Sequence, residues 1–250
     1  MAGEIVKTRG IVLALHPWSR TSQIVTWLTP DHGVVTTLVK GALRPKSAFL
    51  GQYDLFYACD LLYYARPHGS LYLPREVVPR KLREHLRGNW RATALAGYAA
   101  GLVRDLAPPG GEAAAWYDFF EDFLETLARD ASLRRLVQLE MAVLRLAGLA
   151  PDFSALDAQA TWTPFSVERG RCGEGPRLLR LTPRTVAALR RPDAPSTTDE
   201  ALADAARFLG IFLAYHLDQS PDVRRTLLGL VAANLANSSS WHKAGDTSAE

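Results

Sequence analysis

The spacing of apolar and polar residues along the chain changes its period near Pro79. Before that point, apolar, β-branched and aromatic residues recur at every second position in short segments, which is typical of half-buried strands. Five strands are therefore predicted, at residues 4–16, 22–29, 33–41, 53–65 and 71–78. The breaks between them are the turn-forming sequences HPWS, PDHG, ALRPKS and RPHG. Strands this short and this closely spaced predict a small closed or nearly closed barrel, and an OB-fold β-barrel is one such structure.

After Pro79 the apolar period is about 3.6 residues, which predicts helices. Helical segments are expected at residues 80–107, 112–130, 132–149, 181–191 and 199–219. The second of these carries one apolar stripe, formed by Trp116, Phe119, Phe120, Phe123, Leu124 and Leu127. Such a stripe is the pattern of a helix packed on other helices. Between Ala150 and Arg180 the regular pattern stops, which predicts a loop-rich insert.

These segments predict an α+β protein of several domains. Residues 1–80 are expected to form the barrel, and residues 81–150 together with 181–236 a helical bundle. The insert spans residues 151–180, and residues 237–250 are expected to form a flexible tail. With 250 residues, of which 48% are hydrophobic, the chain is long and apolar enough to bury such cores.

Positive charge is concentrated in the first part of the chain, although the net charge of the whole is only +3. Residues 1–85 hold eleven lysines and arginines and six acidic residues, so this part carries +5 and the remainder carries −2. A site for a polyanion therefore depends on where the charge is placed rather than on its total.

Several classes of protein are disfavoured by what the sequence lacks. Two cysteines, Cys59 and Cys172, are too few for a disulfide framework or a four-thiolate metal site, which fits a reducing cytoplasm. Neither a secretory signal nor a run of about 18 apolar residues occurs, so no membrane span is expected. Because the GxxxxGK[ST], GxGxxG, GxSxG and HExxH motifs are also absent, we expect no enzyme, no cofactor and no bound metal.

A cluster of cations follows the third predicted strand. Lys40, Arg44 and Lys46 surround Gly41 and Pro45. Glycine permits a close approach of the backbone to a ligand and proline stiffens a loop, so the flanking cations can meet successive phosphates. The alternative is a solvated hairpin tip that binds no ligand.

Other residues of the same module favour the phosphate interpretation. Lys7, Arg9 and Arg20 lie on or beside neighbouring strands. Aromatic residues are interleaved with these cations, namely Trp18, Trp27, Tyr53, Phe56 and Tyr57. Cationic grooves with stacking aromatics bind single-stranded nucleic acid in such barrels. We expect one or two of the aromatics to contact a ligand and the others to fill the barrel.

A second set of cations is spaced three and four residues apart, and consists of Arg80, Arg83, Arg87 and Arg91. On one helix this spacing places all four on one face. The face would either extend a DNA-binding track or form an ordinary solvent-exposed surface balanced by Glu84. Glu140 and His216 lie on apolar helix stripes instead. We expect Glu140 to pair with a buried arginine and His216 to form a hydrogen bond, because buried polar groups need partners.

Several short motifs, taken in order, resemble the RecO family of bacterial recombination mediators. In the N-terminal part they are Gly10-Ile11-Val12-Leu13, Ser22-Gln23-Ile24-Val25, Thr29 with Gly33, Lys40-Gly41-Ala42 with Ser47, and Tyr53-Asp54-Leu55-Phe56. In the helical part they are Leu139-Glu140 with Leu144, and Gly148-Leu149-Ala150-Pro151. The resemblance extends over nearly the whole chain, which makes it more specific than any single motif.

This resemblance implies an N-terminal OB barrel, a helical domain and a zinc-finger-like insert. It also implies a cytoplasmic, nucleoid-associated protein of the RecF/RecO/RecR repair pathway that binds single- and double-stranded DNA. Such a protein anneals complementary strands without enzymatic turnover, works with RecR, and helps RecA replace single-strand-binding protein. The acidic tail of single-strand-binding protein would dock in an apolar pocket of the helical domain edged by cations, for which Arg129, Arg134 and Arg135 are the candidates.

The insert and one loop depart from the family pattern. The family often has two CxxC pairs in the insert, and at the corresponding positions this chain has Ala158, Thr161, Cys172 and Gly175. Because tetrahedral zinc needs several thiolates or imidazoles, we expect a metal-free insert packed around Phe153, Trp162 and Phe165. Arg20 stands where an acidic residue is expected, which adds positive charge to the predicted DNA-binding face.

Two other functions are compatible with the sequence. The chain would be a protein-protein adaptor if its barrel recruits protein and its cations serve solubility. It would be a hydrolase if Glu140 and His216 formed a reaction centre. Alanine substitution of Lys40, Arg44 and Lys46 separates these alternatives, because only the first interpretation requires DNA binding to fall.

Overall fold

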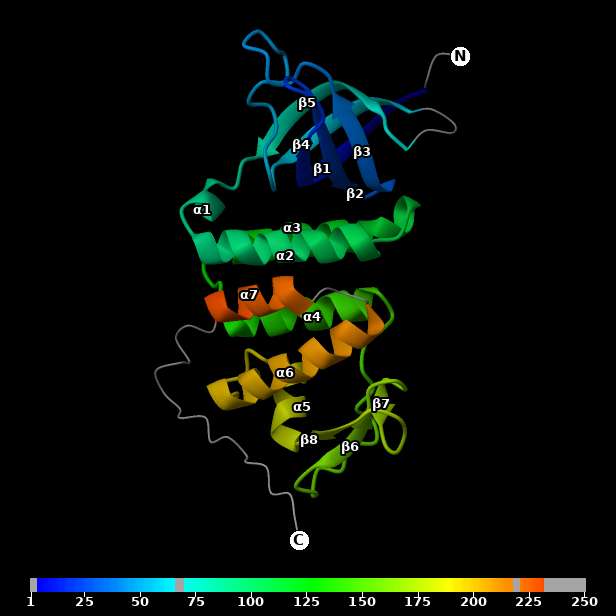
Figure 1. The fold of residues 1–250 in the computed structure, drawn as a ribbon, viewed down its shortest axis with the longest axis vertical. Coiled ribbons are helices and arrows are strands. Elements are labelled where there is room, and N and C mark those ends of the chain that lie inside the picture. Colours follow the sequence, from blue (N-terminus) through cyan, green and yellow to red (C-terminus); the bar gives the residue numbers. More distant parts are fainter. Residues whose placement is uncertain (1–3, 66–69, 218–220, 232–250) are drawn as a thin grey trace.

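The fold is given by a computed structural model, which describes residues 4–65, 70–217 and 221–231. A five-stranded sheet lies at one end of the molecule, helices cross its middle, and a small three-stranded sheet lies at the other end (Figure 1). The five strands precede the helices along the chain, and the small sheet is inserted between two groups of helices. An α+β architecture with a strand-rich N-terminal part and a helical part is thus confirmed.

The N-terminal sheet is antiparallel throughout. Its strands are β1 (Glu4–Pro17), β2 (Gln23–Thr29), β3 (Gly33–Val39), β4 (Ala58–Ala65) and β5 (Leu73–Lys81), in the order β3-β2-β1-β4-β5. The long strand β1 pairs twice, its first half with β4 and its second half with β2. A register shift between Val12 and Ala14 lies next to the point where the partner changes. Such irregularities bend a strand, so β1 can turn the corner of a curled sheet.

The sheet curls but does not close into a continuous barrel. Within the described residues, its edges meet at an isolated parallel bridge between Thr37 of β3 and Tyr72, just before β5. There Leu38 N–H donates to Tyr72 O at 2.8 Å. A longer ladder is hindered because Pro74 and Pro79 in β5 have no N–H to donate. Of the two forms expected, a closed or a nearly closed barrel, the structure has the second, an OB-like sheet that does not form a complete barrel.

Alternation along the strands fills the interior of this sheet. Buried and half-buried positions alternate in β3, as the period of two predicts. The buried side chains that form this small core include Val12, Val25, Trp27, Val35, Val39, Leu61 and Val77. The indole N–H of Trp27 donates to Thr37 Oγ1 at 2.9 Å, so the polar atom of this buried ring has a partner.

Most helical segments follow the predicted positions, except at the first boundary and after residue 219, where no separate helix was predicted. They are α1 (Glu84–Arg87), α2 (Trp90–Leu106), a 3₁₀ turn η1 (Gly110–Ala113), α3 (Ala114–Thr126), α4 (Leu133–Leu146), α5 (Pro183–Arg190), α6 (Asp199–His216) and α7 (Pro221–Val231). A single helix over residues 80–107 is wrong, because β5 continues to Lys81, which pairs with Ala58 of β4. The long helix α2 begins only where the Asn89 side chain accepts from the N–H groups of Arg91 and Ala92.

One hydrophobic core joins the sheet to the helices. Ile11, Leu13 and Leu28 of the sheet belong to the same buried cluster as side chains of α2 to α6. Helices α2 and α3 lie between the sheet and helices α4 to α7 (Figure 1). The sheet and the helices therefore pack as one continuous interior. Across residues 4–65, 70–217 and 221–231, no helix has both the length and the apolar character needed to cross a bilayer.

The insert forms a small sheet of its own. Its strands are β6 (Thr163–Ser166), β7 (Arg171–Cys172) and β8 (Leu178–Leu181), in the order β7-β6-β8. Phe153 and Phe165 are buried against two phenylalanines of α6, as expected for the insert core. Trp162 is 43% exposed and lies under the guanidinium of Arg180 at 4.8 Å. Its predicted place in the core is therefore wrong, because it precedes β6 at an exposed end.

Glu140 of α4 is completely buried and fully partnered. Arg224 of α7 donates to its two carboxylate oxygens at 2.7 and 2.8 Å, and the hydroxyl of Tyr98 donates at 2.9 Å. The predicted ion pair with a buried arginine is thus confirmed. His216 Nε2 lies 2.8 Å from Val167 O, which confirms its predicted hydrogen bond. Glu140 thus joins α2, α4 and α7, and His216 joins α6 to the insert.

Candidate nucleic-acid interface

Two turns are joined at the outer end of the N-terminal sheet. The β1–β2 turn is closed by a hydrogen bond from Trp18 N–H to Ser22 O at 2.9 Å. The segment after β3 is attached to this turn, because Gly41 N–H donates to Ser22 Oγ at 3.1 Å and Leu43 N–H donates to Thr21 O at 3.0 Å. Gly41 has a φ of 65°, which residues with a Cβ rarely adopt. Glycine at this position therefore sets the path of the cationic segment.

The joined turns carry exposed cations that have no acidic neighbours in sequence. We call them the tip surface and define it by Trp18, Arg20, Lys40, Arg44 and Lys46, all of which are exposed. Between Asp31 and Asp54 the sequence contains no acidic residue. Among the described residues, none of the four cations forms an ion pair. The turns that carry the tip surface lie at the end of the sheet farther from the helices (Figure 1).

The tip surface also contains an exposed aromatic ring. Of the five aromatics predicted as stacking candidates, Trp18 is 60% exposed, whereas the others are buried. Burial raises the pKa of Tyr53 to about 12, and its neutral hydroxyl donates to Gln23 Oε1 at 3.0 Å. Leu43 and Leu50 on the neighbouring loop are also about half exposed, which the sequence reasoning missed. Their exposure could have been predicted from their position among turn residues, because no strand or helix there could bury them.

Lys7 and Arg9 lie elsewhere and in a different electrostatic setting. They precede Trp18 by eleven and nine positions along β1, which rises about 3.3 Å per residue. Both line a shallow hollow of about 460 Å³ that is also lined by three carboxylates, those of Asp31, Asp60 and Asp118. The guanidinium of Arg9 lies 5.2 Å from the ring centre of Tyr117. The structure therefore does not bring these two cations together with the tip surface, and their role in DNA binding stays a prediction.

The second predicted set of cations does not form one helix face. Arg80 lies in β5, and its Nε donates to Asp60 Oδ2 at 2.7 Å, a hydrogen bond that raises the pKa of Arg80. Arg83 is only 6% exposed and has a positive φ of 50°. Its guanidinium donates to Phe56 O at 2.5 Å and to Glu125 Oε1 at 3.0 Å. Arg83 therefore joins the sheet to α3 and is not available for direct contact with DNA.

Arg87 and Arg91 are also engaged with their surroundings. Arg87 in α1 donates to Asp54 Oδ2 at 2.5 Å and to the hydroxyl of Tyr57 at 2.9 Å. Arg91 in α2 is half-buried, with its guanidinium 5.2 Å from the ring centre of Trp90. The predicted single face is wrong because Gly88 and Asn89 separate α1 from α2. The interface role of Arg80, Arg87 and Arg91 stays a prediction.

An apolar pocket edged by cations lies between α3, α4 and α5. It has a volume of about 400 Å³, and its apolar wall includes Phe119 and Phe123 of the predicted stripe. Its cations are Arg135, Arg145 and Arg190, and its lining also includes two carboxylates, those of Asp122 and Asp193. Arg129 and Arg134 do not line it. Arg135 Nε forms an ion pair with Asp130 Oδ2 at 3.8 Å, which is too far for a hydrogen bond, and this buried Nε has no hydrogen-bond partner among the described atoms. An anionic group entering the pocket would supply that partner.

Of these three arginines, only Arg135 was among the predicted candidates. Arg145 shares the α4 face of Arg135 at spacings of three and four through Gln138 and Ala142, so it could have been found from helical periodicity. Arg190 comes from α5 and is held by a hydrogen bond to Phe153 O at 3.2 Å. No local pattern indicates that contact, because it joins residues 37 positions apart.

The insert does not fit a tetrahedral zinc ion. Of the four positions that correspond to the CxxC pairs, only Cys172 carries a possible ligand. Burial raises the pKa of the Cys172 thiol, which disfavours the thiolate that zinc requires. At Gly175 a Cβ would lie 2.6 Å from Ser166 Oγ, so the backbone here is too closely packed for a larger ligand side chain. Within the described ranges, no group of three or more His, Cys, Asp or Glu side chains converges as a metal site.

Comparison with known proteins gives a consistent result along the chain. The family model described as "Recombination protein O N terminal" matches residues 1–82, and "Recombination protein O C terminal" matches residues 87–225. DNA repair protein RecO of Anaeromyxobacter sp. (strain K) is 29% identical over 245 residues, covering 89% of this chain and 95% of the relative. DNA repair protein RecO of Synechocystis sp. is 26% identical over 178 residues, covering 69% and 65%. DNA repair protein RecO of Rhodopirellula baltica is 42% identical over 82 residues, covering 33% and 29%.

The fold and these relatives together define the class of protein as a DNA repair protein with an OB-like sheet and a helical C-terminal part. The two matches cover the chain up to residue 225 except for residues 83–86, and they follow one another in the same order as the two structural parts. The chain belongs to the RecO family. The resemblance first suggested by the short motifs is thus confirmed.

Proposed function

We propose that this chain is a non-enzymatic DNA-binding protein of the RecF/RecO/RecR repair pathway that holds DNA on the tip surface. The observation that carries the proposal is the acid-free run between Asp31 and Asp54, whose exposed cations lie beside Arg20 and Trp18. Phosphate groups are attracted to such a surface whatever the base sequence, so both single- and double-stranded DNA are expected ligands. Trp18 adds a flat apolar face on which an unpaired base can stack.

Strand annealing follows from the same electrostatics. Two complementary strands repel each other because both are polyanions, and a cationic surface that neutralises both lowers this repulsion and raises their local concentration. This mechanism requires no nucleotide hydrolysis, and it is therefore compatible with a protein that turns over no substrate. A protein with this activity is expected in the cytoplasm, at the nucleoid.

The partner proteins are assigned by chemistry to the helical part. The pocket between α3, α4 and α5 combines apolar walls with three arginines and two aspartates. Its lining keeps an excess of one positive charge, which is compatible with the acidic tail of single-strand-binding protein. Docking there would bring that protein to DNA held on the tip surface, where the chain helps RecA replace it. RecR is an expected partner, and no surface is assigned to it.

The central test removes the charge of the tip surface. The triple variant Lys40→Ala, Arg44→Ala, Lys46→Ala is compared with the wild type by fluorescence anisotropy of a labelled single strand over a series of salt concentrations. If all three cations contact phosphates, the slope of log affinity against log salt becomes shallower by about 2, since each contact contributes about −0.7 for single strands. At about 0.1 M salt the same relation gives a loss of affinity of roughly 100-fold.

A matched control separates local contact from loss of net charge. Arg169, Arg171 and Arg180 are exposed cations of the insert, so their triple alanine variant changes the net charge by the same amount. It should leave the slope unchanged. An equal loss in both triple variants, or an affinity independent of salt, contradicts the proposal. Normal DNA binding with lost partner binding would instead favour a protein-protein adaptor, and annealing that requires ATP would contradict the non-enzymatic mechanism.

A further inference from the structure

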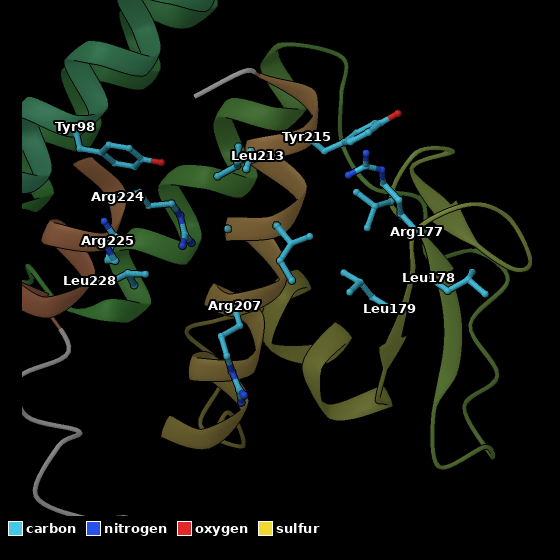
Figure 2. A pocket seen from close by; sticks show the side chains of 14 residues that line it. Tyr98, Arg177, Leu178, Leu179, Arg207, Leu213, Tyr215, Arg224, Arg225 and Leu228 are labelled. Carbon is cyan, nitrogen blue, oxygen red and sulfur yellow. The ribbon is translucent and has the colours of Figure 1, made fainter. Parts of the chain in front are cut away.

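A second groove lies between α6, α7 and β8, away from the pocket of α3, α4 and α5. We call it the α6–α7 groove; it has a volume of about 730 Å³, and the two hollows share no lining residue. The side chains that define it are Arg177, Leu178, Arg207, Ile211, Tyr215 and Leu228. Arg177 and Tyr215 lie side by side on one wall, and Arg225 and Leu228 of α7 lie across from them (Figure 2). The groove therefore joins the helical part to the inserted sheet.

The groove exposes apolar side chains to solvent. Leu178 is 53% exposed, Ile211 is 49% exposed and Tyr215 is 38% exposed. Single exposed apolar residues are common on protein surfaces, but several lining one hollow mark an interaction site. Because its walls are this open, the hollow is suited to a segment of another protein rather than to an enclosed small molecule.

The charge of the lining is one-sided. The lining residues include four arginines, and none of these described residues is acidic. Two arginines have carboxylate partners outside the lining, since Arg224 pairs with buried Glu140 and Arg207 pairs with Asp204. Arg177 has no carboxylate partner within the described part of the chain, and its guanidinium lies 5.1 Å from the ring centre of Tyr215. An acidic ligand is therefore complementary to the rim of the groove.

Arg177 is held in place by its backbone. Its φ of 52° is uncommon for a residue with a Cβ, and its carbonyl accepts from Val167 N–H at 3.2 Å. Stacking on Tyr215 further orders the side chain. An ordered arginine loses less conformational entropy on binding a carboxylate than a mobile one does, which favours docking.

We propose that the α6–α7 groove docks an acidic, apolar segment of another protein. Apolar side chains of that segment would cover Ile211 and Leu178, and its carboxylates would pair with Arg177 at the rim. DNA is a poorer occupant, because the apolar walls offer phosphate no contact. Residues 232–250 of this chain are also a poorer occupant, since they contain only two acidic residues, Asp246 and Glu250, and one lysine, Lys243.

The test uses the full chain and a defined probe. The probe is a fluorescein-labelled amphipathic peptide of about 14 residues, with leucines at helical spacing and Glu or Asp at the other positions. Its control has lysine in place of every acidic residue. Anisotropy should show binding of the acidic peptide and at least about tenfold weaker binding of the lysine peptide, because the rim arginines repel lysine.

Three variants locate the binding site. Ile211→Glu places a carboxylate in the middle of the groove and should weaken binding of the acidic peptide by about tenfold or more. The control Ile5→Glu makes the same change on β1, where Ile5 is 47% exposed, and should leave peptide binding within about twofold of the wild type. Arg177→Gly accepts the φ of 52° and should weaken binding by about threefold or more. Circular dichroism checks that each variant is folded, as expected for changes at exposed positions.

Other outcomes overturn the proposal. Equal binding of the acidic and lysine peptides removes the electrostatic argument, and unchanged binding by Ile211→Glu places the site elsewhere. If a synthetic peptide of residues 232–250 displaces the acidic probe, the occupant is the chain's own terminus. Loss of oligonucleotide binding in Ile211→Glu, with no effect on the peptide, makes the groove part of the DNA interface instead.

Discussion

Removal of Arg224 should expose how strongly the chain depends on its buried ion pair. Glu140 is completely buried and the Arg224 side chain is only 10% exposed, so water cannot solvate the carboxylate once the arginine is gone. Breaking a buried pair in this way typically costs about 3–5 kcal/mol, because an uncompensated charge remains inside. We therefore expect Arg224→Leu to lower the free energy of unfolding by about that amount, as measured by urea denaturation with circular dichroism.

Removal of the whole network should cost much less. In the triple variant Tyr98→Phe, Glu140→Leu, Arg224→Leu no buried charge is left, and we expect it to be within about 2 kcal/mol of the wild type. Tyr98 is included because burial raises its pKa, so it stays a neutral donor that would lose its acceptor. The remaining cost comes mainly from Ala206 O, which loses the hydrogen bond from Arg224.

The control for this prediction is another arginine of α7, Arg225. Arg225→Leu changes an exposed arginine on the same helix and should alter the free energy of unfolding by no more than about 1 kcal/mol. A cost below about 1 kcal/mol for Arg224→Leu would refute the reasoning. So would a triple variant as unstable as Arg224→Leu, since the cost would then come from lost packing and not from a stranded charge.

Three further predictions follow from the described side chains. Trp18→Ala should weaken the binding of single-stranded DNA by about 1–3 kcal/mol and the binding of duplex DNA much less, whereas Trp18→Phe should keep most of the affinity. Both affinities are measured by anisotropy, and an equal loss for the two DNA forms would argue against stacking. Addition of a chelator should leave the melting temperature unchanged in differential scanning fluorimetry, and a chelator-induced fall would reveal a metal. Burial raises the pKa of the Cys59 thiol to about 12 and also raises the pKa of the Cys172 thiol. Both thiols are therefore protonated at about pH 8 and should react with Ellman's reagent only after unfolding. Rapid labelling of the native chain would contradict this prediction.

Local patterns in the sequence predicted most of the strands and helices of the fold. The period of two located all five N-terminal strands, because a strand that buries one face must alternate its side chains. The period of 3.6 located α2 to α6 for the equivalent reason. The main error lay at the boundary between the two patterns, where β5 continues past Pro79 through its pairing with β4. A strand's partner is not encoded in its own residues, so periodicity could not show this extension.

The candidate sites were only partly predictable. The cationic segment from Lys40 to Lys46 could be found because glycine, proline and lysine stand together in sequence. In the sequence, Arg83 could not be told apart from the other three arginines of its set, but in the structure it is buried against Phe56 and α3. Burial depends on which distant segments pack against a residue. The arginines of each hollow come from different elements, namely α4 and α5 in one, and α6, α7 and the bend before β8 in the other. Only the packing of these elements brings the arginines together.

The amino-acid sequence by itself determined the classes and order of the elements, the excess of positive charge near the N-terminus, the need for a partner of Glu140 and the membership of the RecO family. These are properties of neighbouring residues and of their periodicity, which physical chemistry fixes locally. Only the tertiary structure decided that Arg224 is that partner, that the sheet stays slightly open, and that Trp18 is the exposed aromatic of the tip. The reason is that solvent exposure and long-range pairing depend on how distant segments pack against each other.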